Sequence, residues 1–115
     1  MKNGYCAQFV RAYAICARWS SVDPDGSPLD GHDIAPETMR EMRSDCADFI
    51  WDNRDDLRAY SDAEQAGDDF WLTRNRHGAG FWDRGLGDRG ERLAAAARIY
   101  GGIDLHIGDD GKVRS

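Results

Sequence analysis

One stretch, residues 68–84, constrains the fold of this chain most, because it gathers large aromatic side chains around a glycine-containing centre. It reads DDFWLTRNRHGAGFWDR and holds two of the four tryptophans and two of the four phenylalanines, as one Phe-Trp pair near each end. Phe70 and Leu72 alternate with their neighbours, and such alternation places successive side chains on opposite faces of a strand. The pattern predicts a β-hairpin that turns at residues 75–80 and carries aromatic residues on both faces.

Apolar periodicity predicts three helices around this stretch. The first covers residues 3–20, where apolar residues recur every three or four positions: Tyr5, Phe9, Ala12, Cys16 and Trp19. The second begins at Pro36, a residue favoured in the first helical turn, and extends to about residue 60. The third covers residues 88–100, since Asp88 can cap its start and two glycines follow its end.

The C-terminal residues predict two short strands. Apolar and polar residues alternate over 103–107, a turn follows at 108–111, and residues 112–114 can return as a second strand. A chain of 115 residues is long enough for one domain with a modest core. We therefore expect a single α+β domain over residues 1–115, in which a small antiparallel sheet, made of the aromatic hairpin and the C-terminal strands, packs against three helices.

Composition places the chain among globular proteins and limits the cellular compartments in which we expect it. Apolar residues make up 41% and charged residues 31% of the sequence. No apolar run approaches the ~20 residues that a bilayer requires, and the N-terminal residues lack the pattern of a secretory signal. The cysteines, Cys6, Cys16 and Cys46, stand singly. We expect a cytoplasmic protein with reduced thiols and no membrane association.

The net charge of −6 is concentrated in the middle of the chain. Residues 36–69 carry four basic and eleven acidic groups, whereas residues 70–115 carry eight basic and six acidic groups. A net acidic surface repels the phosphate backbone, so direct binding of nucleic acid is disfavoured as the main activity. Basic partners are favoured instead.

The acidic residues of the second predicted helix form a stripe. Their spacing of four, three, four and three places them on one side, about 125° from the apolar stripe and over a length of about 21 Å. This scale resembles that of phosphates along duplex DNA, so the stripe could compete for a groove that binds nucleic acid. The alternative is a merely solvated face. The stripe and its flanking residue are Glu41, Asp45, Asp48, Asp52, Asp55 and Asp56.

Several motifs together resemble a known group of proteins. The run from Gln65 through DFWLTRNRHGAGFWDR, the upstream PLDG and DIAPETM, and the downstream DLHIGDDGKV are similar to a widespread family of small, largely uncharacterised bacteriophage-encoded proteins. In such relatives a His commonly precedes D-F-W, where this chain has Asp68, so no role for a His at that place carries over. The resemblance implies a phage-encoded protein that acts in the host cytoplasm, and it favours a role against host defence.

These observations lead to one functional hypothesis. We expect a non-catalytic phage protein, without cofactor or metal, that binds a host protein as an anti-CRISPR or anti-nuclease inhibitor. The partner would be a nucleic-acid-binding defence nuclease or a CRISPR effector subunit. Two contact surfaces are predicted: the possibly DNA-mimicking acidic stripe and the tip of the hairpin, formed by Arg74, Asn75, Arg76 and His77.

Other functions stay open. A small nucleic-acid-binding accessory protein could stack bases on the hairpin tryptophans beside Arg74, Arg76, Arg84, Arg89 and Arg92. An enzyme could use His77 with Asp83 or Asp69 as an acid and base pair. The Asp23 and Asp25 loop resembles the start of a calcium loop, but Pro24 separates the carboxylates, and the three histidines are too scattered for a zinc motif. Exposed aromatic residues could also make a homodimer.

Overall fold

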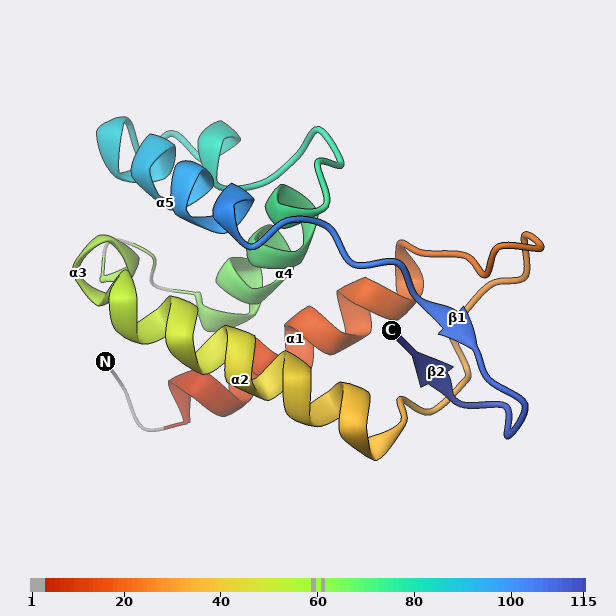
Figure 1. Cartoon of the computed structure of the whole chain (residues 1–115). Coiled ribbons are helices and arrows are strands. Elements are labelled where there is room, and N and C mark those ends of the chain that lie inside the picture. The colour runs from red at the N-terminus through yellow and green to blue at the C-terminus, as the bar shows by residue number, and fades with distance from the viewer. Residues whose placement is uncertain (1–3, 59, 61) are drawn as a thin grey trace.

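The computed structural model describes residues 4–58, 60 and 62–115, and it confirms the α+β class with a small antiparallel sheet (Figure 1). The described residues contain five α-helices instead of the three expected, with one 3-10 helix and one two-stranded sheet. The elements are α1 (Tyr5–Trp19), α2 (Pro36–Asp52), α3 (Arg54–Leu57), α4 (Ala63–Arg74), η1 (Phe81–Asp83), α5 (Asp88–Ile99), β1 (His106–Ile107) and β2 (Val113–Arg114).

The predicted aromatic hairpin is wrong, because its first arm is the second half of helix α4. Asp62 caps this helix, since its Oδ1 accepts hydrogen bonds from the backbone N–H groups of Glu64 and Gln65, at 3.0 and 3.2 Å. Phe70 and Trp71 are both fully buried, so neighbours on different sides of α4 enter the core. Burial on two sides removes the one-sided pattern by which a helix is recognised in sequence. The second Phe-Trp pair lies in η1.

The end of α4 has the geometry of a Schellman motif. Arg76 adopts a left-handed conformation with φ 58°, and the N–H of His77 donates to the carbonyl of Leu72 at 3.0 Å. The N–H of Arg76 donates to the carbonyl of Thr73 at 3.1 Å. These bonds satisfy carbonyl groups that a helix terminus leaves unpaired, and they end the helix where the sequence analysis placed a hairpin turn.

The other elements differ from expectation mainly at their ends. The second predicted helix stops at Asp52, eight residues early, because Asn53 leaves the helical conformation and donates its Nδ2 to the carbonyl of Phe49 at 2.9 Å. A separate four-residue helix, α3, follows. α1 and α5 match the predicted ranges closely, although residue 3 lies outside the described part of the chain. Only residues 106–107 of the expected strand 103–107 pair in the sheet.

The small sheet fastens the C-terminal segment beside the start of α2 (Figure 1). β1 and β2 are antiparallel, with Ile107 opposite Val113. Val113 is fully buried, and its carbonyl accepts a hydrogen bond from the N–H of Ala35 at 2.9 Å. The aromatic residues of 68–84 take no part in this sheet, contrary to the sequence prediction.

The core is aromatic where α1, α2, α4 and η1 meet. The rings of Phe49 and Phe70 stack with centroids 4.2 Å apart, and Phe81 stacks on Phe49 at 5.6 Å. Tyr13 meets Trp71 edge to face at 5.3 Å. Because these side chains come from four different elements, they fix the relative positions of the helices. No helix among the described residues has the length and apolar character needed to cross a membrane.

Candidate functional site

The acidic stripe lies on the surface, as its spacing predicted. We call its six residues, Glu41, Asp45, Asp48, Asp52, Asp55 and Asp56, the acidic face. Asp45 and Asp56 are partly buried and the other four are exposed. On another side of α2, the side chains of Met42, Cys46 and Phe49 are buried. Packing on that side holds the helix so that the carboxylates project outward.

Half of these carboxylates are neutralised by arginine. Asp45 pairs with Arg74 at 2.8 Å and Asp55 pairs with Arg58 at 3.0 Å. Arg92 reaches Asp56 from α5 with two hydrogen bonds, at 2.7 and 2.9 Å, and holds the pKa of that carboxyl below its usual range. Among the residues that the structure describes, the remaining three, Glu41, Asp48 and Asp52, make no ion pair. The unneutralised charge is therefore confined to α2.

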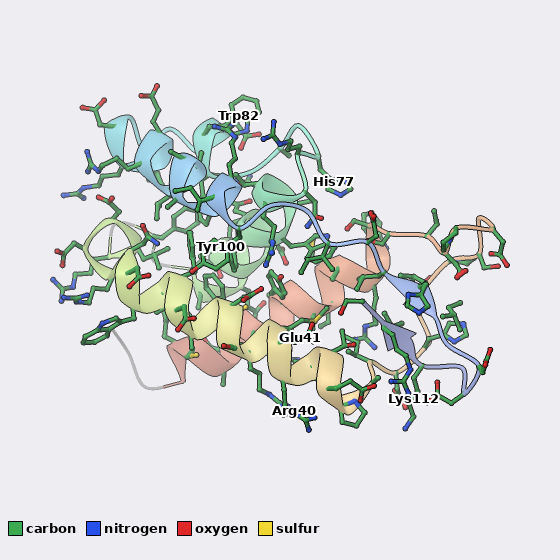
Figure 2. The ribbon with its side chains drawn as sticks, viewed as in Figure 1. Arg40, Glu41, His77, Trp82, Tyr100 and Lys112 are labelled. Atoms are coloured by element: carbon green, nitrogen blue, oxygen red, sulfur yellow. The ribbon has the colours of Figure 1, made fainter. Side chains whose placement is uncertain are left out.

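A tyrosine from another element lies against the acidic face. Tyr100 follows α5, stands between α5 and α2 in Figure 2, and its ring lies 6.0 Å from that of Phe49 of α2. Burial raises the pKa of Tyr100, and the negative charges of Asp52, Asp48 and Asp45 raise it further. The phenol thus stays a neutral hydrogen-bond donor beside three carboxylates, and it adds an amphipathic ring to a charged surface.

The four residues predicted for the hairpin tip do not form one surface. Arg74 is only 4% exposed, and its guanidinium donates to Tyr13, Asp45 and the carbonyls of Tyr100 and Gly101 at 2.8 to 3.1 Å. The side chain of Asn75 bonds the backbone of Trp71 and Ile103. Arg76 and His77 are exposed beyond the end of α4. The prediction of a hairpin tip is wrong because these residues form the end of a helix, where the side chains of Arg74 and Asn75 face inward.

The basic stacking patch expected for nucleic acid does not assemble either. Trp71 is fully buried, and its indole N–H donates to the hydroxyl of Ser20 at 2.9 Å. Arg84 is bound to Asp69, and Arg92 to Asp56. Trp82 and Arg76 remain exposed and line one pocket, but Trp71 is not available to stack a base beside them.

The proposed acid and base pair is not formed in this structure. The carboxylate of Asp69 accepts hydrogen bonds from Arg84, Gln65 and the hydroxyl of Tyr60, and His77 is not among its partners. Asp83 accepts from the N–H of Gly80 at 3.3 Å. Figure 2 shows His77 on the outer side of its loop, apart from Trp82. The described residues offer its ring no hydrogen-bonded carboxylate.

The candidate metal ligands have other roles. The carboxylate of Asp23 accepts from the N–H of Ile107 at 3.1 Å, and that of Asp25 from the N–H of Ser27 at 3.0 Å. His32 bonds the carbonyl of Gly111 at 2.9 Å. All three cysteines are thiols, and burial raises the pKa of Cys16 to about 11. Within the described ranges, no three His, Cys, Asp or Glu side chains are close enough together to hold a metal ion.

A surface that the sequence analysis missed is a groove between α1 and α2, with a volume of about 1080 Å³. We call it the α1–α2 groove. Helix α1 buries a wider set of residues than its predicted stripe, including Val10 and Ala14, while the predicted member Trp19 is exposed. The small side chains on this face of α1 were the one signal in the sequence. The groove is lined by Cys6, Ala7, Val10, Arg11, Ala14, Ile15, Arg18, Asp33, Ile34, Pro36, Met39, Arg43, Ala47 and Lys112.

The two surfaces occupy different sides of the same helix. At 100° per residue, the α2 positions that line the groove and the unpaired carboxylates of the acidic face are separated by about 155° around the helix axis. Figure 2 shows Glu41 and Arg40 on different sides of α2 and Lys112 near its N-terminal end.

Comparisons with known protein families, with curated proteins and with solved structures found no match to this chain.

Proposed function

We propose that this protein is a non-catalytic inhibitor that binds a basic, nucleic-acid-binding surface of a host protein through its acidic face. The observation that carries the proposal is the exposure of Glu41, Asp48 and Asp52 on one rigid helix without arginine partners in the described structure. Exposed charges of one sign attract an opposite surface and speed association with it.

Geometry limits how closely the acidic face imitates DNA. Glu41 to Asp52 spans about 16 Å at 1.5 Å per residue. Duplex DNA carries one charge per ~1.7 Å along its axis, so three unneutralised carboxylates give a much lower charge density. We infer that the face contributes steering and a few specific contacts to basic side chains, while Tyr100 adds a hydrogen bond and apolar contact area.

The packing supports a preformed contact surface. The buried side chain of Arg74 forms an ion pair with Asp45, and the ion pair between Arg92 and Asp56 connects α5 to the acidic face. A surface that is already ordered loses less conformational entropy when it binds. We propose, from the resemblance of residues 65–84 and their flanking motifs to bacteriophage-encoded proteins, that the partner acts in host defence, as a nuclease or a CRISPR effector subunit in the host cytoplasm.

The test compares three proteins in affinity capture from host lysate, followed by assay of nuclease activity in the captured fraction. The first is the native chain and the second carries Asp48→Asn and Asp52→Asn. The third, a matched control, carries Asp104→Asn and Asp109→Asn, which remove the same charge from exposed positions outside the acidic face. We expect the native and control proteins to retain and inhibit a nucleic-acid-binding protein, and the second to lose it. Equal capture by all three would show that the acidic face is not the contact.

A further inference from the structure

The floor of the α1–α2 groove is apolar and follows both helices. From α1 it receives Ala7, Val10 and Ala14, which are spaced three and four residues apart. From α2 it receives Met39 and Ala47. Small side chains keep the floor low, and the lining positions of α1 extend from residue 6 to residue 18. That distance corresponds to about 18 Å at 1.5 Å per residue.

The rim of the groove is basic, although the protein as a whole is acidic. Arg11 of α1, Arg43 of α2 and Lys112 of the C-terminal segment all line it. In the part of the chain that the structure describes, none of these three forms an ion pair. Arg18 donates to the carbonyl of His32 at 3.1 Å. Because that partner is a neutral group, it does not compensate the positive charge of Arg18. Against these four cations the lining has one carboxylate, Asp33.

The dimensions fit a helix. A helix of radius ~5 Å that is half sunk into a surface over ~18 Å displaces about 700 Å³, which the volume of about 1080 Å³ accommodates. A site for a small ligand usually encloses most of the ligand's surface, whereas this groove is open to solvent. Laying the apolar side of an amphipathic helix into an apolar groove is a common mode of peptide recognition.

We propose that the α1–α2 groove binds an acidic amphipathic helix from a partner protein. The bound helix has apolar residues at positions i, i+3, i+4 and i+7, which face Val10, Ala14 and Met39. Asp and Glu on its flanks face Arg11 and Arg43. This contact goes beyond the proposed inhibition, and it uses the opposite side of α2, so the two surfaces bind independently.

The test uses designed 18-residue peptides and fluorescence anisotropy with the native protein. The probe has Leu at the apolar positions and Glu on the flanks. One control peptide replaces each Glu with Lys, and another has the same composition in a scrambled order without an apolar side. We expect the probe to bind with a Kd below about 1 mM, at least about tenfold tighter than either control. Equal binding of the scrambled peptide would reduce the effect to bulk charge and overturn the proposal, as would failure of the probe at about 1 mM.

Protein variants locate the contact. Arg11→Glu with Arg43→Glu should weaken probe binding at least about tenfold, whereas Arg89→Glu with Arg98→Glu, the same charge change on α5, should alter it less than about twofold. Ala47→Trp fills the groove without changing charge and should also weaken binding. Circular dichroism of each variant checks the fold. Undiminished binding to both the Arg11/Arg43 variant and the Ala47→Trp variant would overturn the proposal.

Cys6 supplies a second, independent measurement. It lines the groove and is exposed, whereas Cys46 is buried. Alkylation of Cys6 by iodoacetamide should slow when the acidic probe peptide is present and stay unchanged with the scrambled peptide. The same assay with laurate separates an acyl-chain ligand from a helix. Protection by laurate but not by the probe would show that the groove takes a lipid, which contradicts the proposal.

Discussion

At the scale of single residues, Asp69 shows how this core tolerates a buried charge. Its side chain is fully buried, and both carboxylate oxygens accept hydrogen bonds from Arg84, at 2.8 and 3.0 Å. Gln65 donates to it at 3.3 Å, and the hydroxyl of Tyr60 donates as well. Burial raises the pKa of Asp69, and Arg84 opposes that rise. The arginine is therefore the group that keeps the carboxylate charged in the core.

Replacing Arg84 by Met should destabilise the protein in a pH-dependent way. Loss of one partner of a buried ion pair typically costs about 3–5 kcal/mol. Because Arg84 is 34% exposed, we expect the lower end, about 3 kcal/mol at about pH 7. Without Arg84 the folded pKa of Asp69 rises further above its unfolded value, so the folded state binds the proton more tightly and stability falls as pH rises through that pKa. The destabilisation should thus be smaller at about pH 5 than at about pH 7.

Urea denaturation of the native and variant proteins at both pH values measures this difference. The matched control adds Asp69→Asn to Arg84→Met, which removes the titrating carboxyl, and the pH dependence of the destabilisation should then disappear. A free energy of unfolding that drops equally at both pH values in the single variant would contradict the assigned role of Arg84.

At the scale of elements, helices α1 and α4 approach each other closely at one glycine. Gly67 lies where the two helices cross, and a side chain on it would collide with the backbone carbonyl of Phe9. The position is fully helical, within α4. Close contact of the two backbones brings Phe70 and Trp71 of α4 against Tyr13 of α1. This one glycine therefore determines the distance between the two helices and how closely their aromatic side chains pack.

The substitution Gly67→Ala should reverse the usual effect of its type. In an open helical position, Gly→Ala stabilises by about 1 kcal/mol. Here the added methyl group must push α1 and α4 apart, and overpacking of this kind costs about 1–3 kcal/mol. Thermal unfolding followed by circular dichroism should show a lower Tm. Ser44→Ala, at an exposed position of α2, is the control and should leave Tm unchanged or slightly raised; a raised Tm for Gly67→Ala would contradict the tight crossing.

The same elements show what the sequence could and could not predict. The ranges of α1 and α5, and the four members of the acidic face that lie in α2, follow from periodicity within one helix, which is a local property. α4 was missed because Phe70 and Trp71 are buried on different sides of it, although Asp62 with Gln65 three residues later was a usable capping signal. The pairing of Asp56 with Arg92 joins residues far apart in the chain. Such pairs, and the α1–α2 groove, depend on how helices pack and leave no local pattern.

At the scale of the whole molecule, Arg74 connects segments that are distant in sequence. From the end of α4 its guanidinium reaches Tyr13 in α1, Asp45 in α2 and the carbonyls of Tyr100 and Gly101 after α5. It also lies over the rings of Phe70 and Tyr100, at 5.6 and 5.4 Å from their centroids. One buried planar cation thus joins the aromatic core to the acidic face.

Arg74→Lys should therefore be far from conservative. An ammonium group cannot reproduce the fork of donors, so carbonyls near the end of α5 and the hydroxyl of Tyr13 would lose their partner. We expect a loss of about 2–4 kcal/mol in the free energy of unfolding, measured by chemical denaturation. Arg76→Lys, at the exposed neighbouring position, should stay within about 0.5 kcal/mol of the native protein. Equal stability of both variants would show that Arg74 is not the connecting group.

The unequal placement of the four tryptophans decides what light emission from this protein reports. Trp19, Trp51 and Trp82 are 78%, 67% and 49% exposed, whereas Trp71 is fully buried. The three exposed indoles already emit from water in the folded state, and a soluble quencher can reach them there. A shift of the emission wavelength on unfolding then arises from Trp71, so the fluorescence of the whole chain reports on the contact between α1 and α4.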